Sequence, residues 1–188
     1  MARHRRIFVS GASAHVIKRG HNFGAVFRCR SDYQQFITLM REAALASGVA
    51  VHAFTLMTTH IHLLATPTHR LSLPAMMKGC CEQFTPFCNR RYERSGTIWN
   101  GRYDALIVDS ERYWLTCLRY IERNPVAAGI VNDPSEYEWS SYRTHAFGEP
   151  SDWLVLHPLY LALGSTPATR QAVYRALCGG PELGSDPV

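Results

Sequence analysis

Two histidines stand two positions apart in the apolar run MTTHIHLLATP, residues 57–67. Residues i and i+2 of a strand point to the same face, so His60 and His62 should project together. Ile61 and Leu63 then face the other way. Two neutral imidazoles side by side supply much of a divalent metal site, whose open positions substrate oxygens can fill. Taken alone, such a pair is more often structural, so its partners decide the interpretation.

A tyrosine and an asparagine share one stripe of the segment YWLTCLRYIERNPVAAG, residues 113–129. Tyr120 and Asn124 lie one helical turn apart, and Tyr113 lies two turns before Tyr120 on the same stripe. A phenol and an amide on one face can serve as a nucleophile and an oxygen ligand. The alternative is a half-buried tyrosine followed by an asparagine that caps the helix.

The segments that carry these residues read as alternating strands and helices. Strands are expected near 7–18 and at 49–57, 61–67 and 102–109. Helices are expected at 31–48, in part of 71–96, at 110–124 and at 167–178. The expected N-caps are Ser31, Ser110 and Thr166, and the expected stops are Gly48 and Gly179. Gly79 and Pro86 should weaken the second helix, and Pro125 should end the third at Asn124.

This order predicts an α+β fold of the ferredoxin-like, split βαβ type. It has a central antiparallel sheet of about four strands, helices on one face of the sheet, and a C-terminal helical tail. We expect residues 1–148 to form the functional domain and residues 149–188 to form an extension with a short helix.

The chain has 188 residues, a length that fits one domain. Its net charge is +5, and the charged side chains are distributed unevenly along it. Residues 1–30 contain cationic side chains and no acid, whereas the chain from residue 133 onward is mainly acidic. A cationic front indicates a polyanionic partner. The six cysteines form no CxxC pair, which disfavours a zinc knuckle and suggests reduced thiols. No apolar run is long enough for a membrane helix, and we expect a cytoplasmic protein.

A second basic segment, NRRYERSGTIWNGR, covers residues 89–102. It interleaves arginines with Tyr92 and Trp99, a mixture that suits phosphate contacts and base stacking. Packing of Trp99 in the core is the alternative. The candidate DNA-binding residues are Arg3, Arg5, Arg6, Lys18, Arg19, Arg90, Arg91, Arg94, Trp99 and Arg102.

Several segments together resemble the REP-associated tyrosine transposases, a branch of the HUH single-strand nucleases with one catalytic tyrosine. MTTHIHLLATP resembles their His-hydrophobic-His motif, and YIERNPVAAGIV resembles their tyrosine segment. RGHNFGAVFRCRSDYQQF, YEWSSY and HPLYLALG follow the family's order. The chain departs from the family before the first histidine, where Thr58 and Thr59 replace the usual Pro-Asn.

The resemblance implies a role for each matching residue. His60 and His62 would be metal ligands, Asn124 would be the third ligand, and Tyr120 would be the nucleophile. The cofactor would be a divalent metal, Mg or Mn. The substrate would be single-stranded DNA with palindromic hairpins, cleaved and rejoined through a 5′-phosphotyrosine. His4 and His15 are expected at the surface without a role.

The sequence leaves two other functions open. The first is a binding module that grips hairpin DNA or RNA without cutting it. The second is a structural or regulatory protein with an unrelated metal site. Under the enzyme interpretation we expect a bacterial, nucleoid-associated monomer or homodimer without a membrane partner.

Overall fold

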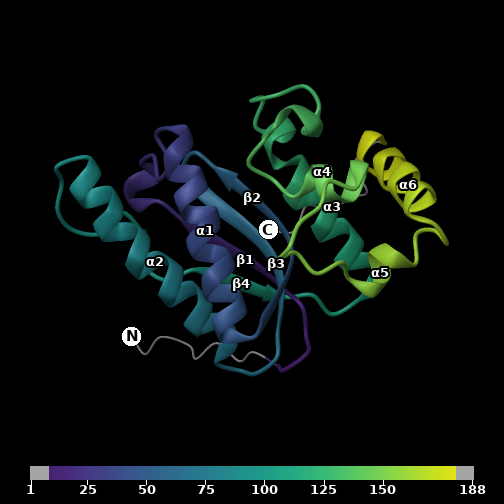
Figure 1. Cartoon of the computed structure of the whole chain (residues 1–188), viewed down its shortest axis with the longest axis horizontal. Helices are drawn as coiled ribbons and strands as arrows, with labels where there is room; N and C mark the ends of the chain where they lie inside the picture. The colour runs from purple at the N-terminus through teal and green to yellow at the C-terminus, as the bar shows by residue number, and fades with distance from the viewer. Residues whose placement is uncertain (1–8, 181–188) are drawn as a thin grey trace.

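An antiparallel sheet of four strands, in the order β2-β3-β1-β4, forms the centre of the protein (Figure 1). The computed structural model describes residues 9–180. The strands are β1 (Ala14–Arg19), β2 (Val49–Met57), β3 (His60–Pro67) and β4 (Asp104–Ile107). The first and fourth strands are shorter than expected, and residues 7 and 8 lie outside the described range. The strand order and the α+β class confirm the predicted fold.

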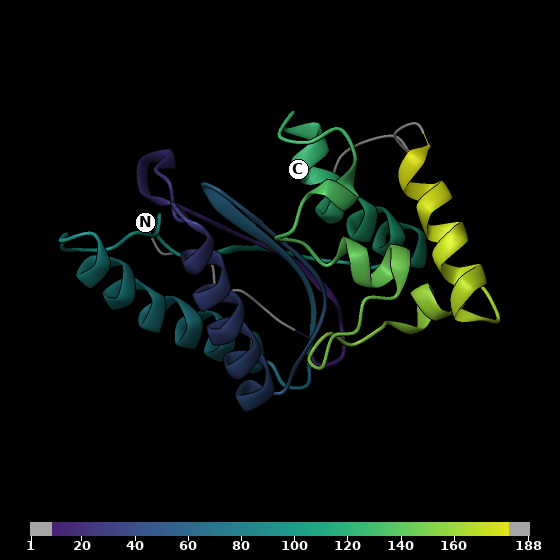
Figure 2. The same cartoon turned by 45° about the horizontal axis from the view of Figure 1, so that its top comes forward.

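Helices cover both faces of the sheet, which differs from the expectation of one covered face (Figure 2). Helices α1 (Arg30–Ser47) and α2 (Ser72–Arg91) pack on one face, and α3 (Glu111–Ala127) packs on the other. The burial of β2 and β3 matches this arrangement, because almost every side chain of both strands is buried, on either face. Two hydrophobic clusters result, one on each side of the sheet.

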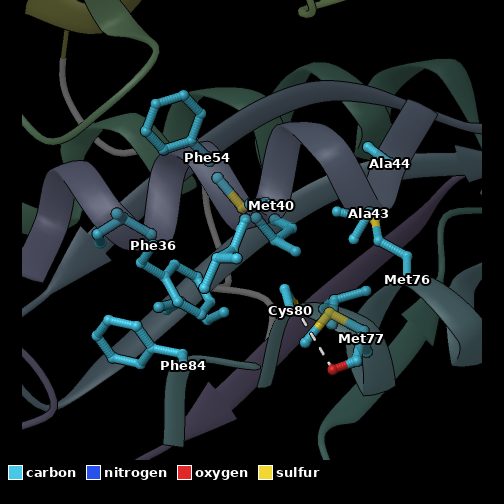
Figure 3. Close-up of a cluster of buried hydrophobic side chains, with 14 of the residues drawn as sticks. Phe36, Met40, Ala43, Ala44, Phe54, Met76, Met77, Cys80 and Phe84 are labelled. Carbon is cyan, nitrogen blue, oxygen red and sulfur yellow. Dashed lines mark hydrogen bonds between the residues drawn. The ribbon is translucent and has the colours of Figure 1, made fainter. Parts of the chain in front are cut away.

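The larger cluster lies between α1, α2 and the sheet (Figure 3). Phe36 and Met40 from α1 meet Met76, Cys80 and Phe84 from α2 there. This apolar stripe keeps α2 continuous, although Gly79 and Pro86 lie inside it. The predicted helix within residues 71–96 is therefore present, and burial of the stripe outweighs the local cost expected from the two residues.

Helix α1 begins one residue earlier than expected. Cys29 is its N-cap, and the carboxylate of Asp32 accepts hydrogen bonds from the backbone N–H groups of Arg28 and Cys29 at 2.8 and 3.3 Å. The predicted capping role of Ser31 is therefore wrong. Gly48 ends the helix as predicted, with a φ of 64° in the left-handed region.

Helix α3 begins at the predicted N-cap, where the Ser110 side chain accepts a hydrogen bond from the Tyr113 N–H. It does not end at Asn124 but continues through Pro125 to Ala127. Proline has no N–H to donate to the carbonyl four residues earlier, that of Ile121. The Thr55 hydroxyl of β2 donates to this carbonyl at 2.7 Å instead. A tertiary contact thus supplies the bond that the helix lacks.

Three shorter helices follow α3: α4 (Tyr142–Phe147), α5 (Pro158–Leu161) and α6 (Pro167–Gly179). They pack with α3 in the second hydrophobic cluster. The predicted cap of α6 is confirmed, since the Thr166 side chain accepts a hydrogen bond from the Thr169 N–H. No helix within residues 9–180 has the length and apolar character needed to cross a membrane.

Candidate metal and nucleophile site

The histidine pair lies at the start of β3 and faces α3. Register places His60 opposite Arg19 and His62 opposite Ile17 of β1. The two imidazole centroids are 4.9 Å apart. Ile61 and Leu63 pack in the cluster on the other face, as the alternation of the strand predicts.

A third histidine joins the pair. His15 of β1 is 1% exposed, and its Nε2 lies 3.0 Å from Nδ1 of His62. The expected surface position of His15 is therefore wrong. The sequence holds a weak signal for the position of His15. His15 lies on the same face of β1 as Ile17, and Ile17 is the residue that pairs with His62. The register between β1 and β3 is needed to use that signal.

All three imidazoles are held in the neutral form that binds metals. Burial lowers the pKa of His15 to about 4. Burial, followed by the charges of His15 and His60, holds the pKa of His62 well below its usual value. Burial and the nearby Arg19 lower the pKa of His60, while a hydrogen bond with the Asn124 side chain opposes that shift. At neutral pH these rings therefore carry lone pairs rather than charges.

Hydrogen bonds at Nδ1 orient both rings of the pair. Nδ1 of His62 pairs with His15, and Nδ1 of His60 lies 3.0 Å from the Thr59 hydroxyl. Each ring can then offer its Nε2 to a ligand, as is common when a second group fixes a metal-binding imidazole. Thr59, which departs from the family motif, thus still holds His60 in place.

The two candidate residues of α3 lie against this cluster. The Tyr120 ring packs edge-on at 5.7 Å from the His62 ring and 5.8 Å from the His15 ring, measured between centroids. Asn124, one turn later, hydrogen-bonds His60. The structure therefore brings together the four residues selected from the sequence.

This donor set fits a divalent ion. Two neutral imidazoles and one amide oxygen suit first-row divalent metals, and phosphate oxygens can complete the coordination. Within residues 9–180, no group of three or more His, Cys, Asp or Glu side chains could hold a metal by itself. An ion bound by His60 and His62 would therefore need its third ligand from Asn124 or from the substrate.

The candidate DNA-binding residues differ in exposure and in their contacts. Arg19, Arg90 and Arg102 are exposed and available for phosphate contacts. Arg91 lies 3.6 Å from the Asp32 carboxylate, and Arg94 donates to the Thr97 carbonyl at 3.0 Å. These two arginines therefore also brace their own segment. Arg3, Arg5 and Arg6 lie outside the described residues.

Two members of that set are buried on the α2 side of the sheet. Trp99 is 5% exposed and packs with Phe36 and Phe84, so its ring has no free face for a base. Lys18 is also 5% exposed; its ammonium donates to the Gly101 carbonyl and lies 5.6 Å from the Trp99 ring centroid. The stacking and phosphate roles expected for these two side chains are therefore wrong.

Comparison with known proteins places the site in a family. A family model described as "Transposase IS200 like" matches residues 8–124, a range that contains the three histidines and ends at Asn124. No curated protein matches the sequence.

Two solved structures show how widely the fold is shared. A REP-associated tyrosine transposase bound to a REP hairpin is 19% identical with a TM-score of 0.67, over 82% of this chain and 92% of that one. The tRNA(His) guanylyltransferase of Saccharomyces cerevisiae is 8% identical with a TM-score of 0.50, over 96% of this chain and 76% of that one. These two likenesses concern the fold, whereas the family model concerns the sequence that carries the site. The chain belongs to the family of IS200-like transposases, which confirms the enzyme class predicted from its sequence.

Proposed function

We propose that this protein cleaves and rejoins single-stranded DNA that carries palindromic hairpins, with Tyr120 as the nucleophile. One observation carries the proposal: the Tyr120 ring packs against His62, while Asn124 on the same helix contacts His60. A phenol, two neutral imidazoles and an amide thus converge from α3 and β3. A tyrosine can act as the nucleophile, and the other three groups can hold a metal ion that activates a phosphate.

The residues of the chain have distinct parts in the reaction. His60, His62 and Asn124 would hold a divalent ion, Mg or Mn, and such an ion would polarise the scissile phosphate and offset its developing charge. The Tyr120 oxygen attacks phosphorus and loses its proton, while the bond from phosphorus to the 3′-oxygen breaks and that oxygen takes up a proton. The products are a 5′-phosphotyrosine and a free 3′-OH. Attack by another 3′-OH reverses the step and releases Tyr120.

Two findings support hairpin DNA as the substrate. The REP-associated tyrosine transposase that shares this fold is bound to a REP hairpin. Arg19, which is exposed, lies opposite His60 in the register of β1 and β3, next to the position expected for a phosphate. A guanidinium suits this position because its planar donors match phosphate oxygens.

The direct test is to trap the intermediate. The protein is incubated with end-labelled hairpin oligonucleotides and Mn²⁺ or Mg²⁺, and the adduct is digested and mapped by mass spectrometry. A nucleotide on the Tyr120 peptide is expected, and its yield should vanish in EDTA. An adduct on another residue would contradict the assignment. Tight hairpin binding without any adduct would favour a non-catalytic binding module.

A further inference from the structure

The connection between β1 and α1 presents an aromatic side chain to solvent. Phe23, in the short 3₁₀ turn η1 (His21–Phe23), is 80% exposed, the largest exposure among the large hydrophobic side chains described. Asn22 and Phe23 have φ values of 52° and 55°. A bulky residue rarely adopts this left-handed conformation. Such backbone strain persists where surrounding contacts enforce it, and it is concentrated at binding sites.

Hydrogen bonds fix this loop to the residues that precede His60. The Gly20 N–H donates to the Thr59 carbonyl at 2.7 Å, and the Val26 N–H donates to the Thr58 carbonyl at 2.8 Å. The loop is also tightly closed, because a Cβ on Gly20 would lie 2.4 Å from the Gly24 carbonyl oxygen. In Figure 2 the loop lies beside the turn from β2 to β3. Phe23 is therefore held on a short, anchored loop at the same end of the sheet as the metal-ligand pair.

Cationic side chains flank the aromatic ring along the chain. Arg19, directly before the loop, is exposed and lies opposite His60 in the sheet. Arg28, near the end of the same connection, is also exposed, with its guanidinium carbon 4.7 Å from the Tyr92 ring centroid. Proteins that bind single-stranded DNA combine these two features, arginines for the backbone and an aromatic face for a base.

We propose that Phe23 is a stacking platform for a base in the single-stranded flank of the DNA, next to the phosphate that Tyr120 attacks. The proposal deepens the proposed function and rests on it. An isolated exposed phenylalanine would need no explanation. Phe23 differs because the fold holds it in a strained conformation and anchors its loop to the turn that leads into the strand of the ligands, and because exposed arginines precede and follow it in the chain. Stacking tolerates any base, so Phe23 would position the strand rather than read its sequence.

The test uses hairpin oligonucleotides with a single-stranded 5′ flank in which 2-aminopurine replaces one base at a time. In the wild-type protein its fluorescence should be quenched at one flank position. In Phe23→Ala this quenching should disappear, and the flanked hairpin should bind about 5- to 100-fold more weakly. Phe23→Trp should retain both properties. The control Phe147→Ala, which removes a 50% exposed phenylalanine in α4 that also lies near an arginine, should leave both unchanged.

A stability measurement separates stacking from a structural role. Phe23→Gly relieves the left-handed strain, so its thermal midpoint should be unchanged or raised while quenching is lost. Quenching that is absent in the wild type or that survives in Phe23→Ala would overturn the proposal. Equal losses in Phe147→Ala, or a lowered midpoint in Phe23→Gly, would also overturn it. Failure of the proposed function looks different: no covalent adduct forms, while the Phe23-dependent quenching remains.

Discussion

At the scale of single residues, we predict opposite effects on the covalent adduct when each of the two tyrosines on the α3 stripe is replaced by phenylalanine. Tyr120→Phe should abolish the covalent adduct and leave hairpin binding intact, because it removes one oxygen and nearly preserves shape. Tyr113→Phe should still form the adduct. Tyr113 lies roughly 16 Å from Asn124 along the helix axis, and burial followed by the charge and hydrogen bond of Cys117 raises its pKa to about 12. Denaturing electrophoresis of labelled complexes measures the adduct. Adduct formation by Tyr120→Phe would exclude Tyr120 as the nucleophile.

His15 shows what the sequence did not reveal at this scale. The chemistry of His60, His62, Tyr120 and Asn124 could be read from local spacing, because each pair lies within one strand or one helix. His15 meets His62 across two strands that are far apart in the chain, and only their register brings the rings together. The burial of Trp99 could not be decided from the sequence for a similar reason, because it depends on α1 and α2 packing over the ring.

Removing His15 should weaken metal binding without touching a proposed ligand. His15→Ala leaves Nδ1 of His62 without its partner, so Mn²⁺ affinity measured by calorimetry should fall about 10- to 100-fold. His15→Gln should recover part of that loss, because its amide can reach the position of Nε2. Unchanged Mn²⁺ affinity in His15→Ala would show that His15 only fills space. A thermal melt of each variant controls for unfolding.

At the scale of the elements, local patterns located most helices and strands but misjudged their ends and interruptions. Gly48 and Ser110 act through their own neighbours, and both predictions were correct. Helix α3 passes Pro125 because Thr55, a residue of another strand, satisfies the carbonyl of Ile121. No local pattern contains that contact. It matters for the site because the additional turn keeps Asn124 inside a helix rather than at its frayed end.

Thr55→Val should therefore cost stability. It leaves the buried Ile121 carbonyl unpaired, and we expect the free energy of unfolding to fall by about 1–3 kcal/mol. Thr116→Val is a matched control on α3, because the Thr116 hydroxyl bonds the Arg112 carbonyl, which the helix already uses. Its cost should stay within about 0.5 kcal/mol. Urea unfolding followed by circular dichroism measures both.

A double-mutant cycle isolates the cause of the Thr55 effect. Pro125→Ala restores an N–H that can donate to Ile121, so Thr55→Val should cost about 1 kcal/mol less in that background. Equal costs in both backgrounds would show that Thr55 acts through something other than the missing proline donor.

At the scale of the whole molecule, the C-terminal segment shares the core of the domain. Tyr160, Tyr174 and Cys178 pack in one cluster with Leu64 of β3 and Trp114 of α3. The segment before α5 also runs along β2, where the Val155 N–H donates to the Val51 carbonyl at 2.9 Å. These contacts place residues of the predicted extension directly on the helix that carries Tyr120.

Two arginines of α3 take part in this docking. Arg119 and Arg123 donate to the Gly180 carbonyl at 2.6 and 3.2 Å. Their sequence neighbours Tyr120 and Asn124 face the histidines, so α3 divides its surface between the site and the C-terminal segment. A substitution that loosens the C-terminal segment should therefore also destabilise the part of α3 that carries Tyr120 and Asn124.

The buried carboxylate of Glu122 is the polar centre of this docking. It accepts hydrogen bonds from the hydroxyls of Ser141 and Tyr174, the latter at 2.5 Å, and lies 2.8 Å from Nδ1 of His145. Each donor comes from a part of the chain that follows α3. Loss of one donor should leave a buried carboxylate oxygen unpaired, which costs more than loss of a neutral contact.

Tyr174→Phe tests this coupling between the C-terminal segment and the site. The free energy of unfolding should fall by about 1–3 kcal/mol, because the buried Glu122 side chain loses the hydrogen bond from the Tyr174 hydroxyl. Tyr142→Phe is the control, since Tyr142 belongs to the same cluster and, within residues 9–180, its hydroxyl is not hydrogen-bonded to Glu122. Its cost should stay within about 0.5 kcal/mol. Hydrogen exchange should then show faster opening of α6 and of the C-terminal turn of α3 in Tyr174→Phe than in Tyr142→Phe. Faster exchange in α6 alone would mean that the segment docks without supporting the helix that carries Tyr120 and Asn124.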